Sequence, residues 1–349
     1  MPSSVSESYK VVKADLTRDR DRILALWQHL ADSDAPGAEK LDWFYIDNPA
    51  GEGIIYLLWF IPENRPVGIM CAGRRNFRVG DQILHGAVFG DFAMEPAHRS
   101  LGPSLLLQRK VMDEALANFD VFFGFLNASS ARVRQVGGYQ VNEKLVDSII
   151  PLRLAFHLKK RLPDILATIV SSIMQPLYDT MLRVRIKKHM KGYQDAAVNR
   201  DFIDGLWSQA CKNSTIMGVR DWGFLSWRMS PNAGRKYAVS GIRDASGKPC
   251  GYIAYEFQLN DTVVVVDYLA LNNSVFAALL CYLISHTEKT NTPSISICTN
   301  VKDSEKLRVL RKLGFVARGE FFVFVVCDKK ITHQFDTDMI YLNHFDNDV

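Results

Sequence analysis

Residues Gln82 to Ala115 read QILHGAVFGDFAMEPAHRSLGPSLLLQRKVMDEA, and the rest of the chain is organised around them. The apolar run 83–94 predicts a strand that stops before a proline, and residues 105–118 predict a helix. The turn between them, residues 99–104, aims unpaired backbone N–H groups and the positive end of a helix dipole at one point, which suits a phosphate. From spacing alone, an ordinary strand-to-helix connection explains Gly102 and Pro103 equally well.

The flanking segments supply a sheet for this stretch. In chain order, the residue patterns predict a helix over 18–30, strands over 54–61 and 66–77, a hairpin turn at Gly80-Asp81 and, after the central helix, a strand over 120–126. A strand, a helix and a second parallel strand of this length make a βαβ unit. The turn therefore lies at the carboxyl end of the strands, where ligands bind in such folds.

This stretch resembles the acyl-CoA pyrophosphate loop of the GNAT N-acyltransferase superfamily. The resemblance lies in the order of a strand, Pro96, Arg99, Gly102, a small residue and a helix. That loop reads Gln or Arg, two residues, Gly, one residue, then Gly or Ala, and Ser104 replaces the last of these here. The resemblance implies acetyl-CoA or another acyl-CoA as the acyl donor, with the pyrophosphate on the turn and the pantetheine arm beside the strand end. The residues implied for donor binding are Phe92, Met94, Arg99, Ser100, Leu101, Gly102, Pro103, Ser104 and Asn127.

The catalytic residues depart from the resembled pattern. Asn127 matches a family asparagine that is followed seven positions later by a tyrosine, which protonates the departing thiolate in many members; Arg134 stands at that position. Arginine is not an ordinary proton donor, but its charge can stabilise a thiolate. The strand glutamate of many members falls near Val88 and is absent.

Other acidic residues on the strand are the candidates for the general base. Alternation places His85, Asp91 and Glu95 on one face of the strand. Asp91 is the first candidate because it lies nearest the expected thioester, and Glu95 is the second. A carboxylate that accepts hydrogen bonds from a neighbouring loop explains Asp91 equally well. His98, beside the turn, is expected to face solvent.

The second half of the chain predicts the same order of elements. A helix over 201–211, a hairpin of 237–243 with 249–257, a strand over 262–271, a helix over 274–288, a strand over 294–298, a helix over 304–313 and a strand over 321–327 follow one another. No Arg-x-x-Gly turn follows Ala270. The resemblance therefore implies an α/β (α+β) protein of two tandem GNAT-like domains, each a mixed, mostly antiparallel twisted sheet flanked by helices, with one cofactor site.

The predicted division of the chain is a GNAT domain over 1–154, a basic helical connector over 155–195, a degenerate GNAT-like domain over 196–332 and a C-terminal tail over 333–349. In the connector, basic residues flank an apolar centre that Pro163 and Pro176 interrupt. The favoured interpretation is a pair of connecting helices packed across the two domains. The alternative is an interfacial anchor over 156–191 that makes weak peripheral contact with a membrane.

Composition limits the class of protein. The 349 residues are 48% hydrophobic and 23% charged, as in soluble globular proteins, and the net charge of +4 fits an anionic cofactor without calling for nucleic acid. The six cysteines are scattered without metal-ligand spacing, which predicts small buried side chains, no metal site and a cytoplasmic location.

The resemblance implies an enzyme, an acyl-CoA-dependent N-acyltransferase whose acceptor amine attacks the thioester directly. The acceptor is expected to be a small molecule with a primary amine. Short segments of the second half, LSWR and KYAV, resemble tandem GNAT proteins of bacterial polysaccharide gene clusters, which favours an amino sugar. A non-catalytic CoA-binding or scaffold protein and a Fem-type aminoacyltransferase are the alternatives.

Overall fold

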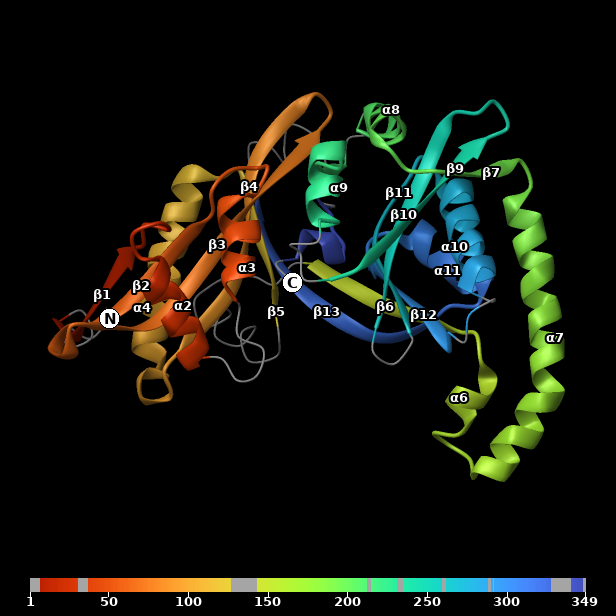
Figure 1. Cartoon of the computed structure of the whole chain (residues 1–349), viewed down its shortest axis with the longest axis horizontal. Helices are drawn as coiled ribbons and strands as arrows, with labels where there is room; N and C mark the ends of the chain where they lie inside the picture. Colours follow the sequence, from red (N-terminus) through yellow and green to blue (C-terminus); the bar gives the residue numbers. More distant parts are fainter. Residues whose placement is uncertain are drawn as a thin grey trace.

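The computed structural model describes residues 7–30, 37–126, 143–211, 215–230, 235–258, 262–287, 290, 292–327 and 340–347. These residues form one continuous sheet of 14 strands with helices on both faces (Figure 1). The mixed α/β architecture predicted from the sequence is therefore present.

The first half contributes one end of the sheet. Its elements are β1 (Tyr9–Lys13), α2 (Arg20–Leu30), α3 (Ala38–Lys40), the π-helix η1 (Leu41–Ile46), β2 (Ile54–Phe60), η2 (Ile61–Glu63), β3 (Arg65–Val79), β4 (Gln82–Met94), η3 (Pro96–His98), α4 (Leu101–Asn118) and β5 (Val121–Leu126). Strands β1 to β4 pair antiparallel in chain order, and β4 pairs parallel with β5. The parallel pair flanking α4 is the βαβ unit expected from the sequence.

The remaining elements complete the sheet from the other end. They are β6 (Glu143–Pro151), α6 (Leu154–Leu158), α7 (Asp164–Met190), β7 (Tyr193–Ala196), α8 (Arg200–Ala210), β8 (Ile216–Gly218), α9 (Trp222–Arg228), β9 (Tyr237–Asp244), β10 (Pro249–Phe257), β11 (Val263–Ala270), α10 (Asn273–Thr287), β12 (Ser294–Asn300), α11 (Ser304–Leu313), β13 (Val316–Cys327), β14 (Ile340–Tyr341) and η5 (His344–Asp346). Strands β9, β10 and β11 are antiparallel, and β11 pairs parallel with β12.

The two halves interleave at the middle of the sheet. Strand β13, from near the end of the chain, lies between β5 and β6, and β6 lies between β13 and β12. The pairs β5–β13, β13–β6 and β6–β12 are all antiparallel. Each half therefore closes its part of the sheet with a strand from the other half, and the division of the chain near residue 154 into separate domains stays a prediction.

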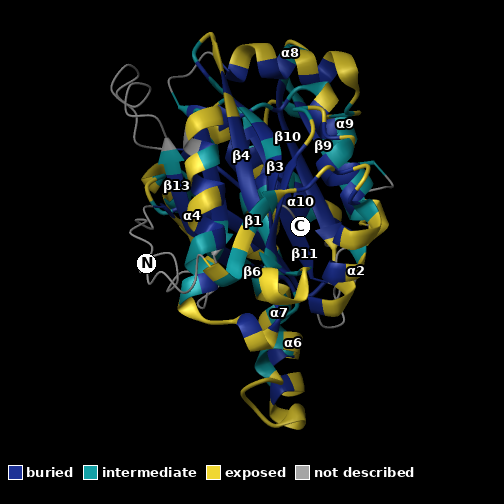
Figure 2. Ribbon diagram, turned by 90° about the vertical axis from the view of Figure 1, so that its left-hand side faces the viewer, coloured by how far each residue is buried: buried dark blue, intermediate teal, exposed yellow. Residues whose placement is uncertain are grey.

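Helices cover the sheet so that most strand residues are buried (Figure 2). In the first half, α2 and η1 pack on one face and α4 on the other, while in the second half α10 and α11 oppose α8 and α9. The halves also meet through Trp43 and Trp227, whose rings stack 4.8 Å apart. Each indole N–H donates to the main-chain carbonyl of the other tryptophan at 3.0 Å. The aromatic segments around these two tryptophans thus contact each other.

Helix α4 begins at Leu101, four residues before the predicted start, and Pro103 is its third residue. The first turn of a helix has no intrahelical acceptors for its N–H groups, so a proline there removes no hydrogen bond and does not delay the helix. The turn that joins β4 to α4 is therefore shorter than expected.

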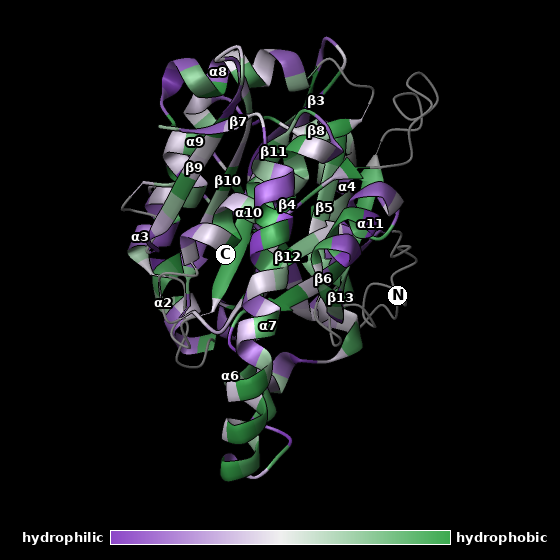
Figure 3. Ribbon diagram, turned by 90° about the vertical axis from the view of Figure 1, so that its right-hand side faces the viewer, coloured by the Kyte–Doolittle hydropathy of each residue, from purple (hydrophilic) through white to green (hydrophobic). Residues whose placement is uncertain are grey.

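The connector contains two helices of very different length, the short α6 and the continuous 27-residue α7, which runs through Pro176. Helix α7 packs mainly against α10 of the second half, and with α6 it extends beyond the sheet (Figures 1 and 3).

A buried charge network ties the two halves to the C-terminal segment. Asp346 accepts hydrogen bonds from Arg75 of β3, at 2.8 and 3.0 Å, and from Arg220, at 2.6 Å. Arg220 also donates to Asp267 of β11 at 3.0 Å. Burial raises the pKa of the Asp346 carboxyl, but the attraction of Arg220 and Arg75 outweighs burial and holds that pKa below its ordinary value. Residues 340–347, expected to belong to a tail, thus lie inside the protein.

His344, in the same segment, gives stability a dependence on pH. Burial first, and the charge of Arg235 second, lower the pKa of its imidazole to about 4. In the unfolded chain this imidazole binds a proton near about pH 6.5. The stability that the neutral His344 contributes is therefore complete above that pH and is lost as the pH falls toward 4. When the pH is lowered from about 7.5 to about 5, we expect the free energy of unfolding of wild type to fall by about 2 kcal/mol more than that of a His344→Gln variant.

Urea unfolding at the two pH values measures this difference. His85→Gln is the matched control, because His85 is exposed on β4. An equal loss of stability in wild type and His344→Gln would exclude His344 as the source of this pH dependence.

Candidate functional site

Strands β4 and β5 separate at their carboxyl ends. Three residue pairs join them, residues 86–88 with residues 121–123, and among the described residues no β4 residue beyond Val88 pairs with β5. Strand β5 continues to pair with β13 on its other side, as far as Leu126 opposite Phe322. The gap in strand pairing beyond Val88, called the opening below, lies beside the turn that leads into α4, and the β4 edge along it has no partner strand among the described residues.

Strand β4 carries a bulge at this opening. Gly90 pairs with Cys71 and Ala93 with Ile69, so two β4 residues, Asp91 and Phe92, oppose one residue of β3. Asp91 has a φ of +45°, a left-handed conformation that is uncommon for a residue with a side chain. Because a bulge shifts the alternation of side chains, the expected common face of His85, Asp91 and Glu95 does not hold.

The Asp91 carboxylate is held by two groups from the segment before β2. Lys40 Nζ lies 2.8 Å from one carboxylate oxygen, and the Tyr45 hydroxyl donates to the other at 2.7 Å. Asp91 is largely buried and Tyr45 completely so. Sequence reasoning missed Lys40 and Tyr45, because nothing local links residues 40–45 to a bulge 46 residues further along.

Glu95, the second candidate base, is engaged in ion pairs away from this cluster. It contacts Arg65 at the start of β3, His29 of α2 at 3.4 Å and His98 at 3.8 Å. His98 was predicted to face solvent, and that prediction is wrong: the ring is buried, and its Nδ1 is 2.8 Å from the Tyr9 hydroxyl. Burial against Tyr9 and Phe60 explains the difference.

The turn into α4 presents backbone groups to the outside. Ser100 is the N-cap of α4, but its side chain makes no capping hydrogen bond, and Leu101 is 54% exposed. Arg99 Nε donates to the main-chain carbonyl of Met94 at 2.7 Å, which fixes the turn to the end of β4. The first turn of this 18-residue helix therefore combines uncapped N–H groups with the positive end of the helix dipole.

The equivalent opening in the second half is filled. Strands β11 and β12 also share three residue pairs, residues 263–265 with 295–297. Beyond these pairs the C-terminal segment contacts both strands. The Tyr341 hydroxyl donates to the carbonyl of Tyr268 on β11, and Asn300 at the end of β12 donates to the carbonyl of Ile340 at 3.3 Å.

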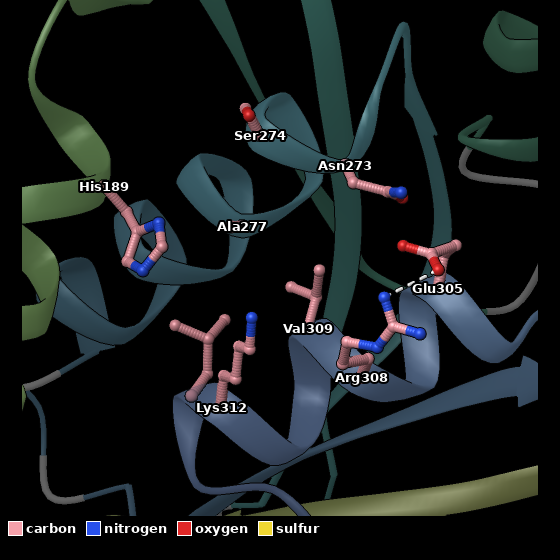
Figure 4. Close-up of a pocket in the computed structure, with 9 residues that line it drawn as sticks. His189, Asn273, Ser274, Ala277, Glu305, Arg308, Val309 and Lys312 are labelled. Carbon is pink, nitrogen blue, oxygen red and sulfur yellow. Dashed lines mark ion pairs between the residues drawn. The ribbon is translucent and has the colours of Figure 1, made fainter.

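The helix after β11 also differs from α4 at its start. The Asn272 side chain accepts hydrogen bonds from the N–H groups of Ser274 and Val275, both at 3.0 Å, so α10 is capped from within the chain. A pocket of about 250 Å³ lies between the start of α10, α11 and the end of α7 (Figure 4). Its Arg308 is paired with Glu305 at 2.8 Å. Of the two helix starts, α4 is the better site for an anion.

Two predicted site residues, Asn127 and Arg134, lie outside the described residues. Of the others, the structure places Phe92 at the bulge, 39% exposed, and Met94 in the core facing α4. The turn residues Arg99, Ser100, Leu101, Gly102, Pro103 and Ser104 follow directly. The predicted donor-binding residues that can be placed are thus brought together at one end of β4.

Comparison with known proteins identifies the fold. No protein-family model matches the chain, and no curated protein matches it in sequence. Among solved structures, a conserved protein of Enterococcus faecalis described as a probable N-acyltransferase matches with a TM-score of 0.63 and 13% identity, over 93% of this chain and 74% of that one.

Two GCN5-related N-acetyltransferases match in the same way. For the protein of Anabaena variabilis the TM-score is 0.61, the identity 12% and the coverage 91% of this chain and 72% of that one. For the protein of Kribbella flavida the TM-score is 0.57 and the identity 9%, over 91% of this chain and 72% of that one. The chain therefore has the fold of GCN5-related N-acetyltransferases over most of its length, which confirms the predicted α/β class with a mixed sheet flanked by helices, while the tandem arrangement stays a prediction.

Proposed function

We propose that this protein is an N-acyltransferase that moves an acyl group, most simply acetyl, from acyl-CoA to a primary amine of a small molecule. The observation that carries the proposal is the opening beside β4, where an unpaired strand edge, an uncapped helix start and a buried carboxylate meet. The fold shared with known N-acetyltransferases supports it.

The turn and the strand edge fit an acyl-CoA. Backbone N–H groups at the start of α4 match the needs of a pyrophosphate, and the edge of β4 beyond Val88 has main-chain groups that can pair with the amides of a pantetheine arm. When bound, acyl-CoA supplies an activated acyl group and a thiol as leaving group. The chain's own task is to hold the donor and bring an amine to it in the correct orientation.

Asp91 is the proposed general base. A primary amine is protonated near neutral pH and must lose a proton in order to attack, and a positioned carboxylate can accept that proton. Tyr45 and Lys40 fix the Asp91 carboxylate at the bulge, so we assign them as positioning residues. Arg134 remains the proposed stabiliser of the departing thiolate.

For the acceptor, we propose an amino sugar as the member of the small-amine class that the likeness to proteins of polysaccharide gene clusters favours. A non-catalytic CoA-binding protein is the second candidate. It is favoured by the hydrogen bonds that Asp91 already accepts from Lys40 and Tyr45, because these occupy both carboxylate oxygens.

Charge placed in the turn tests the donor site. We expect Gly102→Asp and Arg99→Glu to weaken CoA binding at least about tenfold, because a carboxylate then faces the phosphates at the helix start. Ala117→Asp is the matched control, since Ala117 is exposed near the opposite end of α4. Isothermal titration with CoA measures the affinities, and equal affinity of Gly102→Asp and wild type would remove the turn as the donor site.

A second measurement separates the two candidate functions. Release of free thiol from acetyl-CoA is followed with a panel of amines that includes amino sugars. Amine-dependent release supports the acyltransferase. Tight CoA binding without release for any amine supports the non-catalytic protein.

A further inference from the structure

The outward face of α7 is apolar along most of its length. Ten of the eighteen exposed large hydrophobic side chains among the described residues lie between residues 156 and 184. They are Phe156, Leu162, Ile165, Leu166, Ile169, Ile173, Met174, Leu177, Met181 and Val184. Ile165 and Leu177 are 75% and 72% exposed. Such a contiguous apolar surface marks an interaction site rather than chance exposure.

The opposite face of α7 is fixed to the protein. The Tyr178 hydroxyl donates to the Pro151 carbonyl at 2.8 Å, Gln175 donates to the Leu152 carbonyl at 2.9 Å, and Arg185 donates to the Leu313 carbonyl at 2.9 Å. By length and composition alone α7 is able to cross a membrane. These attachments along its inner face hold it against the body instead, so its exposed apolar side chains face away from the body.

Cationic side chains lie at both ends of the apolar face. Lys159, Lys160 and Arg161 are exposed before α7, and Lys187, Lys188 and Lys191 are exposed at its end. The acidic residues of α7 are Asp164, in its first turn, and Asp179, which accepts a hydrogen bond from Gln175 at 2.7 Å. The face is therefore apolar in the middle and basic at each end.

The positive charges at both ends of α7 indicate whether its apolar face binds a second copy of the chain or a membrane. Because both ends of α7 are basic, parallel and antiparallel pairing with a second copy would each bring like charges together. Anionic lipid matches both the apolar face of α7 and the charges at its ends.

We propose that α7 and the turn before it dock the protein onto the surface of a membrane that contains anionic lipid. Helix α7 lies in the interface plane, with Ile165, Ile169, Ile173 and Leu177 inserted among the acyl chains. The lysines and Arg161 at its ends contact lipid phosphates. This proposal does not depend on the acyltransferase activity.

Cosedimentation of the full chain with vesicles tests the proposal. We expect binding to phosphatidylcholine vesicles that contain about 30% phosphatidylglycerol, and weaker binding at high salt. Replacing Ile165, Ile169, Ile173 and Leu177 by glutamine is expected to lower partitioning at least about thirtyfold. Replacing Lys159, Lys160 and Arg161 by glutamine is expected to lower it up to about a hundredfold, or about fivefold for each cation.

The double variant Ile61→Gln and Ile83→Gln is the matched control. These exposed isoleucines lie away from α7, so the variant should bind vesicles as wild type does. Circular dichroism checks that each variant is folded. Three outcomes overturn the proposal: no binding by wild type at low salt, equal binding to vesicles of phosphatidylcholine alone, or a wild-type dimer that the glutamine variant of α7 converts to a monomer.

Discussion

Replacing Asp346 by alanine is expected to destabilise the folded protein by about 3–5 kcal/mol. The Asp346 carboxylate is the shared partner of Arg75 and Arg220, and all three side chains are almost completely buried. Without it, two positive charges remain inside the protein, and among the described residues only Asp267 is paired with one of them. A loss of this size is a large part of the roughly 5–15 kcal/mol that stabilises a typical folded protein.

Chemical unfolding of wild type and Asp346→Ala measures the effect. Asp81→Asn is the matched control: Asp81 is fully exposed in the β3–β4 turn and paired at 3.3 Å with Arg78. A surface pair of this kind contributes about 0–1 kcal/mol, so the control should unfold as wild type does. If Asp346→Ala unfolded at the same denaturant concentration as Asp81→Asn, the network would not hold the two halves together.

Replacing Asp91 by asparagine is expected to lower kcat/KM about 10²- to 10⁴-fold with the best amine of the panel. Asparagine is nearly the same size, tolerates the left-handed backbone that Asp91 adopts, and can still accept from Tyr45, but it cannot take a proton. CoA affinity should remain as in wild type, because the proposed contacts with the pyrophosphate come from the turn and not from Asp91.

Tyr45→Phe separates the base from its positioning. This variant keeps the Asp91 carboxylate and loses one hydrogen bond to it, so we expect a smaller decrease of about tenfold in kcat with little change in KM. Asp81→Asn again serves as the control. Asp91→Asn with kcat/KM within about threefold of wild type would remove Asp91 as the base and leave the proton transfer to another group or to water.

The sequence predicted elements wherever the residue pattern is local. Periodicity and turn residues placed β4, β5, β9, β10 and α11 within a residue or two, because these signals depend on neighbours a few positions apart. The turn around Gly102 was found for the same reason. The short strands β1, β7, β8 and β14 were missed, because their residues become strands only through pairing with distant segments.

The sequence by itself determined that a strand, a turn and a helix meet at Arg99 to Ser104, and it predicted that the same order of elements occurs twice. Tertiary structure decided the rest. The exchange of β6 and β13, the bulge that carries Asp91 to Lys40 and Tyr45, and the filling of the second opening by residues 340–346 all join segments far apart in the chain. Local patterns specify which face of an element is apolar, but which partner covers that face is settled only when the chain packs.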